Sequence, residues 1–293
     1  MIRKTFINLW PIFTLLLSVS LVQGSASLAK SLFPILGPDG VAAWRLTFSA
    51  VLLCLIFKPW KKKITKAACL PLIMYGIAIG IMNMSFYHAI QRIPVGIGIA
   101  IELATGPIAV ALFSSRRISD FCWLALVVLG LYMLLPIHQP HAAIDPIGII
   151  FATVSGLCWA MYIIFGKKAG TIYGPGSSAI GIFIASLFVF PYGLFTNDIH
   201  TMFSPSILPM ALLVAIFASA LPYGLEMIAL PHISAKTFSM LMSLSPVVGS
   251  LSAFIFLHES LTITQWLAIL AIVCSSLGII ISSQRVKSQI DEL

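Results

Sequence analysis

The sequence has 293 residues, of which 59% are hydrophobic and only 9% are charged. Soluble domains carry about 25% charged residues, so this composition excludes an ordinary soluble protein and indicates a polytopic membrane protein. The net charge of +8 does not indicate nucleic-acid binding, because the basic residues gather at alternate ends of the apolar segments.

Ten apolar segments of about 20 residues follow one another along the chain, the length that a helix needs to cross a hydrocarbon core of about 30 Å. We expect helices rather than barrel strands. The predicted spans are 8–31, 40–57, 69–91, 94–114, 119–137, 146–166, 177–195, 206–228, 233–257 and 262–282. Turns such as Gly37-Pro38-Asp39-Gly40 and Gly174-Pro175-Gly176 separate most of them. No connection is long enough for a second folded domain.

The first five segments recur as the second five. The matches are Lys30 with Lys167 and Gly37-Pro38 with Gly174-Pro175, then, at a slightly larger offset, Ala89 with Ala229 and Ile93 with Ile233. Because five is an odd number, the second half enters the membrane from the opposite side. We therefore expect two inverted five-helix repeats, 1–140 and 141–293, that form one transporter domain with a substrate site near mid-membrane.

The distribution of lysine and arginine predicts the orientation. By the positive-inside rule, the lysine-rich ends of the spans and both termini are cytoplasmic. Arg3-Lys4 and the following apolar run imitate a cleavable signal peptide. We reject that interpretation because removal of the first span would leave nine spans and destroy the repeat.

The sequence contains no catalytic or metal-binding motif of a soluble enzyme, such as a Walker loop or H-E-x-x-H. Its five cysteines are widely spaced, lie in or at the ends of apolar spans, and show no metal or redox spacing. We expect buried structural thiols, no catalytic residue and no bound metal.

Glu102 is the acidic residue that lies in the middle third of a span, about 12 Å from the expected outer end of the fourth segment. A charge at the centre of a membrane helix costs about 2.5 to 3.5 kcal/mol on insertion scales, so a charged residue at this place indicates a functional or structural role. Glu102 is therefore a candidate site for a substrate ammonium group, for a proton, or for both in alternation. The alternative is a carboxyl that bonds a neighbouring helix or a water.

Three further charged residues lie inside or near the ends of spans. Glu226, beside Pro222, is either a gating or coupling residue or an interfacial carboxylate that pairs with a lysine, Lys236 or Lys168. Lys30 can extend its ammonium group to the headgroups. Alternatively, Lys30 or Arg45 meets a substrate carboxylate or neutralises Glu102, and Arg45 can equally form an ion pair that serves packing.

Polar and aromatic residues supply a candidate lining for a pocket. Asn83 and Tyr87 share one face of a helix at spacing i and i+4, and Trp159 and Tyr162 are three residues apart. Single aromatic residues in such helices are commonly lipid-facing or interfacial, and His88 is expected to be a hydrogen-bonded helix residue rather than a proton relay. The candidate substrate-binding residues are Glu102, Gln23, Asn83, Tyr87, Trp159, Tyr162 and Tyr223.

The whole chain resembles the drug/metabolite transporter superfamily, in its EamA-type ten-helix branch. Three stretches look like the bacterial threonine/homoserine exporter group: QGSASLAKSLFP at 23–34, GPIAVALFSSRR at 106–117, and ALPY at 220–223 running to EMIAL at 226–230. Two positions depart from the pattern. Ser245 stands where relatives commonly carry an acidic residue before the proline, and His258 stands where glycine is usual.

The resemblance implies an exporter of small neutral amino acids in the bacterial inner membrane, driven by proton exchange, with a cavity between the two halves. It implies no catalysis and no cofactor. The expected partners are a small amino-acid substrate, protons and membrane lipid, with no nucleic acid and with a homodimer as an open alternative. The competing hypotheses are a broad exporter of drugs or amphiphiles, a membrane-embedded enzyme or scaffold, and a nucleotide-sugar carrier.

Overall fold

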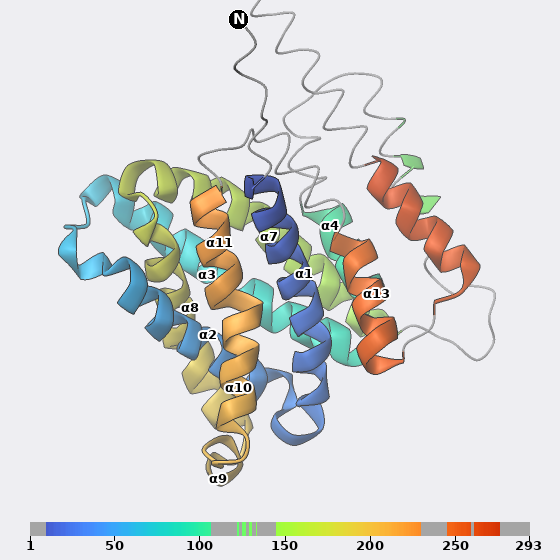
Figure 1. Cartoon of the computed structure of the whole chain (residues 1–293), viewed down its shortest axis with the longest axis horizontal. Coiled ribbons are helices and arrows are strands. Elements are labelled where there is room, and N and C mark those ends of the chain that lie inside the picture. The colour runs from blue at the N-terminus through green and yellow to red at the C-terminus, as the bar shows by residue number, and fades with distance from the viewer. Residues whose placement is uncertain are drawn as a thin grey trace, which may run out of the picture.

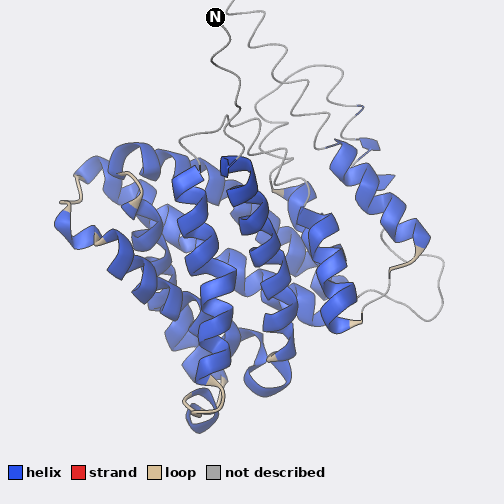
Figure 2. Cartoon of the chain, viewed as in Figure 1, coloured by secondary structure: helices blue, strands red, loops and turns tan. Residues whose placement is uncertain are grey.

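The computed structural model describes residues 10–106, 122, 125–126, 129–130, 133, 145–229, 245–258 and 261–275. Figure 1 shows these residues as a bundle of helices that lie side by side. Figure 2 shows helices joined by short loops, with no strand in the described part of the chain. The expected all-helical class is thereby confirmed for these residues.

The described helices follow the predicted spans with shifted ends. The first half contains α1 (Trp10–Ser31), α2 (Phe33–Phe57), the short 3-10 helix η1 (Pro59–Lys61), α3 (Lys66–Arg92) and α4 (Val95–Thr105). The second half contains α7 (Pro146–Tyr173), α8 (Gly176–Thr196), α9 (Ile199–Met202), α10 (Leu208–Ala215), the π-helical turn η2 (Ile216–Ala220), α11 (Leu221–Ala229) and α13 (Ser245–Leu257). A last helix covers Ile263–Ser275.

Six helices of the described residues are long and apolar enough to cross a membrane. They are α1, α2, α3, α7, α8 and the continuous segment Leu208–Glu226. Most of the predicted span 119–137, and parts of the spans 94–114, 233–257 and 262–282, lie outside the described residues. The count of ten helices and the orientation of the termini stay predictions.

Two predicted boundaries were wrong. The second segment does not begin at residue 40, because α2 starts at Phe33 and continues through a kink at Gly37, where φ is 59° and ψ is 172°. The sixth segment does not end at residue 166, because α7 continues to Tyr173 and ends at Gly174, where φ is 89°. Both glycines adopt a positive φ, which a residue without a Cβ tolerates. The matched Gly-Pro pairs therefore mark real bends of the chain. The ends of α2 and α7, however, lie about seven residues from the predicted ends of these spans.

The first helix of each half packs against helices of the other half. In the first half, α1 lies against α11 and α13; in the second half, α7 lies against α3 and α4. Small residues permit close approach: a Cβ on Gly106 would lie 2.5 Å from the carbonyl oxygen of Gly156 in α7. Helices from residues 10–106 therefore pack directly against helices from residues 145–258.

The outer surface of the described bundle is apolar. Phe13, Phe183, Phe195 and Ile263 are among the exposed large side chains, as expected of a surface that faces lipid. All five cysteines are free, as predicted, but the expectation of buried thiols was wrong for the exposed residues Cys69, Cys122 and Cys274. A thiol behaves as a small apolar group, so hydropathy does not distinguish a lipid-facing position from a core position.

Candidate functional site

Arg45 is a buried cation of α2 that binds neutral groups. Its Nε donates to Oγ of Ser219 at 2.9 Å, one terminal nitrogen donates to the hydroxyl of Tyr87 at 3.1 Å, and the other donates to the carbonyl oxygen of Ala218 at 2.9 Å. Ser219 and Ala218 belong to the π-helical turn η2, after which the backbone N–H of Leu221 donates to the carbonyl oxygen of Ile216, five residues earlier. Arg45 is only 7% exposed and forms no salt bridge with any described residue.

Glu102 lies in α4 and contacts α7. Its Oε1 lies 2.5 Å from Oγ of Ser155, and the same hydroxyl lies 2.9 Å from the carbonyl oxygen of Met82 in α3. Gly156, next to Ser155, lets α4 approach, since a Cβ at this position would lie 2.6 Å from the carbonyl oxygen of Glu102. Glu102 therefore bonds a neighbouring helix, as the alternative interpretation of this residue expects. The same contact is compatible with a functional role.

Glu226 lies in α11 and contacts α1. Its Oε1 accepts a hydrogen bond of 2.8 Å from Oγ of Ser18. Among the described residues it forms no salt bridge, so the expected alternative pairing with Lys168 is absent; Lys236, the other proposed partner, lies outside the described residues.

Three tyrosines connect the neighbourhoods of these charged groups. Tyr75 of α3 and Tyr162 of α7 have ring centres 5.1 Å apart, and Tyr162 and Tyr223 have ring centres 6.3 Å apart. Tyr223 lies near enough to Arg45, Glu102 and Glu226 to interact electrostatically with each of them. The described interior therefore contains one cation, Arg45, and two carboxyls, Glu102 and Glu226, around this group of three tyrosine rings.

The other candidate residues occupy different places. Asn83 is buried and its amide donates to the carbonyl of Ile79, on its own helix, at 2.8 Å. Gln23 is buried in α1 near Gly249 of α13. Lys30 lies in the last turn of α1. Trp159 packs against the apolar cluster that includes Ala89 and Ile93, whereas Tyr162 packs against the central cluster.

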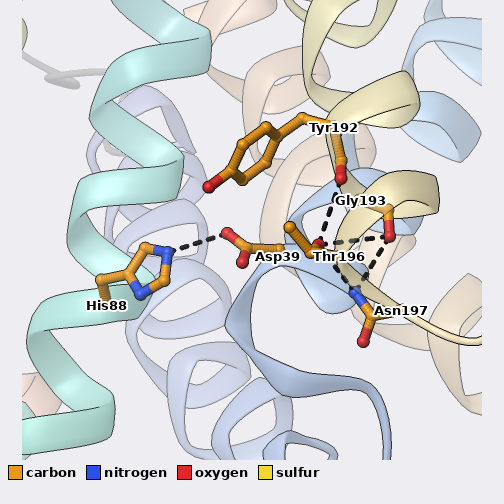
Figure 3. Close-up of polar contacts among 6 residues, drawn as sticks. All are labelled: Asp39, His88, Tyr192, Gly193, Thr196 and Asn197. Carbon is orange, nitrogen blue, oxygen red and sulfur yellow. Dashed lines mark hydrogen bonds and ion pairs between the residues drawn. The ribbon is translucent and has the colours of Figure 1, made fainter.

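A separate polar group lies near the start of α2. His88 of α3 lies 2.8 Å from Oδ1 of Asp39, just after the kink of α2 (Figure 3). The ring of His88 also stacks on Phe151, with 5.0 Å between ring centres. Asn197, after α8, donates to the carbonyl of Gly193 at 3.0 Å beside this kink. The expectation that His88 is a hydrogen-bonded helix residue is confirmed.

Three serines of the site, Ser18, Ser155 and Ser219, were not predicted from the sequence. Each is fully buried and contacts a candidate charged residue. Serines are frequent in membrane helices and commonly bond their own backbone, as Ser25 does with the carbonyl of Val22 at 2.7 Å. The signal available for Ser18 and Ser155 was their equal place in the repeat, 155 − 18 = 137, the offset of Lys30 and Lys167.

No group of three or more potential metal ligands occurs among the described residues.

Comparison with known proteins gives the family. Residues 146–281 match the family described as EamA-like transporter family. The threonine/homoserine exporter RhtA of Escherichia coli K12 is 46% identical over 283 residues, which cover 97% of this chain and 95% of that protein. This chain belongs to the EamA-like transporter family.

Other relatives of this EamA-family transporter extend the comparison. RhtA of Salmonella typhimurium LT2 is 46% identical over 275 residues, covering 94% of this chain and 92% of that protein. The uncharacterized transporter YwfM of Bacillus subtilis strain 168 is 23% identical and covers 70% of each chain. One solved crystal structure, 16% identical, superposes with a TM-score of 0.61 over 93% of this chain and 97% of the other, which shows a shared fold. The resemblance to the EamA-type transporters is thus confirmed, and the chain is a multi-pass membrane protein.

Proposed function

We propose that this EamA-family protein exports small amino acids such as threonine and homoserine across the bacterial inner membrane, by proton antiport and alternating access. The proposal includes ten helices in two inverted repeats, 1–140 and 141–293, with both termini cytoplasmic. It is supported by nearly full-length similarity to proteins named threonine/homoserine exporter. The family match covers residues 146–281. It begins where the proposed sixth span begins, at 146, and it ends one residue before the end of the proposed tenth span, at 282.

The observation that carries the substrate assignment is the placement of Arg45 and Glu102. They lie close enough to interact electrostatically, yet they do not form a salt bridge in the described residues. Three of the five N–H groups of Arg45 are engaged by neutral acceptors. The other two N–H groups of Arg45 can bind a carboxylate. An amino-acid zwitterion carries one charge for each partner, and its binding compensates two charges that are costly inside a membrane.

In this proposal, Glu102 binds the substrate ammonium group and Arg45 binds its carboxylate. Tyr87, Tyr162 and Tyr223 shape the space between them. Glu226 and Lys30 act in coupling or gating. The remaining predicted pocket residues, Asn83, Gln23 and Trp159, contribute to substrate selection.

Proton coupling follows from competition at one carboxyl. Glu102 can hold a proton or face an ammonium group, and the two states exclude each other. An inward-moving proton that replaces an outward-moving zwitterion carries one charge across the membrane. At 100 mV this charge is worth about 2.3 kcal/mol, or a concentration ratio of about fifty.

The test uses purified protein in proteoliposomes loaded with radiolabelled threonine. We expect a pH gradient to drive threonine movement, and we expect Glu102→Gln to reduce the rate by about tenfold or more, because the amide offers no negative charge. Asp145→Asn is the matched control, since Asp145 caps α7 outside the span. Undiminished movement in a folded Glu102→Gln protein would refute the role of Glu102.

Substrate competition distinguishes the proposal from a broad drug exporter. Unlabelled threonine and homoserine should inhibit labelled efflux, whereas bulky organic cations should not, because they lack the carboxylate that Arg45 would bind. Inhibition by the cations alone would favour the broad exporter.

A further inference from the structure

Ser18 and Ser155 occupy the same place in the two halves. They are separated by 155 − 18 = 137 residues, as are Lys30 and Lys167, for which 167 − 30 = 137. Ser18 lies in α1 and Ser155 lies in α7, the first described helix of each half. Both side chains are completely buried.

Both serines approach a backbone carbonyl of the opposite half, and these carbonyls are also related by the repeat. Oγ of Ser155 lies 2.9 Å from the carbonyl oxygen of Met82 in α3, and Oγ of Ser18 lies 3.4 Å from that of Pro222 in α11. Met82 and Pro222 differ by 222 − 82 = 140, the offset between Ala89 and Ala229. We define the Ser155–Met82 approach as the outer serine contact and the Ser18–Pro222 approach as the inner serine contact.

The carboxyls break this symmetry. Glu226 lies one helical turn after Pro222 on the same helix, and it accepts from Ser18 at 2.8 Å. The position related to Glu226, at 226 − 140 = 86, is Phe86. On the outer side the carboxyl comes from α4 instead, where Glu102 lies 2.5 Å from Ser155. Each serine thus has one carboxyl and one carbonyl within reach.

The depth of the two pairs follows from the proposed topology. Ser18 is eight residues after Trp10, which places it about 12 Å from the cytoplasmic end of α1. Ser155 is nine residues after Pro146, which places it about 13 Å from the outer end of α7. The inner serine contact therefore belongs to the cytoplasmic half of the bundle and the outer serine contact to the opposite half.

A serine hydroxyl has a single proton, so it donates to one acceptor at a time. When the carboxyl is ionised, the hydroxyl donates to it, because hydrogen bonds to charged acceptors are stronger than those to neutral ones. The carbonyl then loses its donor. When the carboxyl is protonated, it donates to the serine oxygen, and the hydroxyl is released to donate to the carbonyl.

We propose that Ser18 and Ser155 are positioning residues that link the protonation of Glu226 and Glu102 to closure of the inner and outer halves of the transport path. This inference rests on the proposed proton-coupled function. Protonation of Glu102 strengthens the outer serine contact and holds α7 against α3. Protonation of Glu226 strengthens the inner serine contact and holds α1 against α11.

Other titratable or charged groups also face these carboxyls. Among the described residues, Arg45, Cys158 and Tyr223 lie within electrostatic range of Glu102. Tyr75, Tyr162 and Tyr223 lie within range of Glu226. In the described part of the chain, none of these groups donates a hydrogen bond to either carboxyl, so the serine is the direct partner in both pairs.

Amide hydrogen exchange of the full-length protein in nanodiscs at fixed pH tests the proposal without any substrate. Ser155→Ala should raise exchange at the outer ends of α3 and α7, and Ser18→Ala should raise it at the inner ends of α1 and α11. We expect the exchange rates to change by about threefold, the factor that corresponds to the average free energy of a side-chain hydrogen bond between membrane helices. Glu102→Gln should lower exchange at the outer ends, because its amide donates to Ser155 and leaves the hydroxyl for Met82.

Two controls separate this role from general packing. Ser25→Ala in α1 and Thr153→Val in α7 remove hydroxyls that donate to the carbonyls of their own helices, Val22 and Ile149, and should leave exchange unchanged. Ser155→Thr keeps a hydroxyl and should behave more like the unaltered protein than Ser155→Ala does.

The proposal is overturned if Ser18→Ala and Ser155→Ala raise exchange at the same ends, or if Glu102→Gln acts in the same direction as Ser155→Ala. Threonine efflux by the unaltered protein is measured separately. If efflux fails while Ser155→Ala raises exchange at the outer ends and Ser18→Ala raises it at the inner ends, the proposed substrate is refuted and the serine contacts are supported. Efflux without sided changes would refute the serine contacts alone.

Discussion

Arg45 of α2 donates a hydrogen bond of 3.1 Å to the hydroxyl of Tyr87 in α3, and its guanidinium carbon lies 5.3 Å from the centre of the same ring. One side chain therefore offers the cation both a hydrogen-bond acceptor and an aromatic face. The ring of Tyr87 is itself held by Phe33, at 5.5 Å between ring centres. Tyr87 thus orients the cation that we propose as the carboxylate partner.

Removing this hydroxyl should weaken substrate binding. We expect Tyr87→Phe to raise the KM for threonine by about three- to tenfold, with a smaller change in kcat, because one guanidinium N–H loses its acceptor while the ring remains. Proteoliposome transport at varied threonine concentration measures both constants. Tyr192→Phe, at an exposed residue of α8, is the matched control. Equal KM values for the two variants would contradict the orienting role of Tyr87.

The close crossing of α4 and α7 gives a stability prediction. Gly156→Ala places a methyl group against Thr105 and 2.6 Å from the carbonyl oxygen of Glu102. The helices must separate, at a cost of about 1 to 3 kcal/mol, and the contact between Ser155 and Glu102 should weaken. Thermal unfolding in detergent should show a lower Tm.

The matching variant for this prediction is Gly224→Ala. A Cβ on Gly224 meets no heavy atom of the described residues within 4 Å, so the substitution should leave Tm unchanged or raise it slightly through reduced freedom of the unfolded chain. A Tm loss for Gly224→Ala as large as that for Gly156→Ala would show that alanine is tolerated poorly in these helices for a reason other than the crossing.

Asp145 gives a pH dependence outside the membrane segments. Its Oδ2 accepts from Arg92 at 2.9 Å and its Oδ1 accepts from the backbone N–H of Ile147 at 2.9 Å, which caps α7. The Arg92 hydrogen bond is the main cause that holds the pKa of Asp145 below its ordinary value of 3.8. Because the folded pKa is the lower one, the contribution to stability is present at neutral pH and is lost as pH falls through the folded pKa.

The corresponding variant is Asp145→Asn, which keeps a capping oxygen but loses the charge. We expect a lower Tm than that of the unaltered protein at pH 7 and a difference that shrinks below about pH 4. Arg92→Gln should give the same pattern. A difference in Tm that stays constant down to about pH 3 would place the effect in the helix cap rather than in the ion pair.

Much of the candidate site could be predicted because charge stands out in an apolar sequence. Glu102, Glu226 and Arg45 were identified in this way, and the structure places all three within electrostatic range of Tyr223. Trp159 and Tyr162, three residues apart on α7, were both predicted to line the pocket, and they pack against different apolar clusters. Spacing fixes positions along one helix, whereas the direction of a side chain depends on the helices that surround it.

Hydropathy, turns and long characteristic stretches are local properties of a chain. For this reason the amino-acid sequence was sufficient to predict a helical membrane protein with two related halves and to indicate its family. The choice of partner helices is not local, and it became visible only in the folded bundle, which joins Ser18 to Glu226 and Ser155 to Glu102 across the two halves. Lipid and helix surfaces are equally apolar, so burial does not select a partner helix; close packing of small residues and hydrogen bonds between helices do.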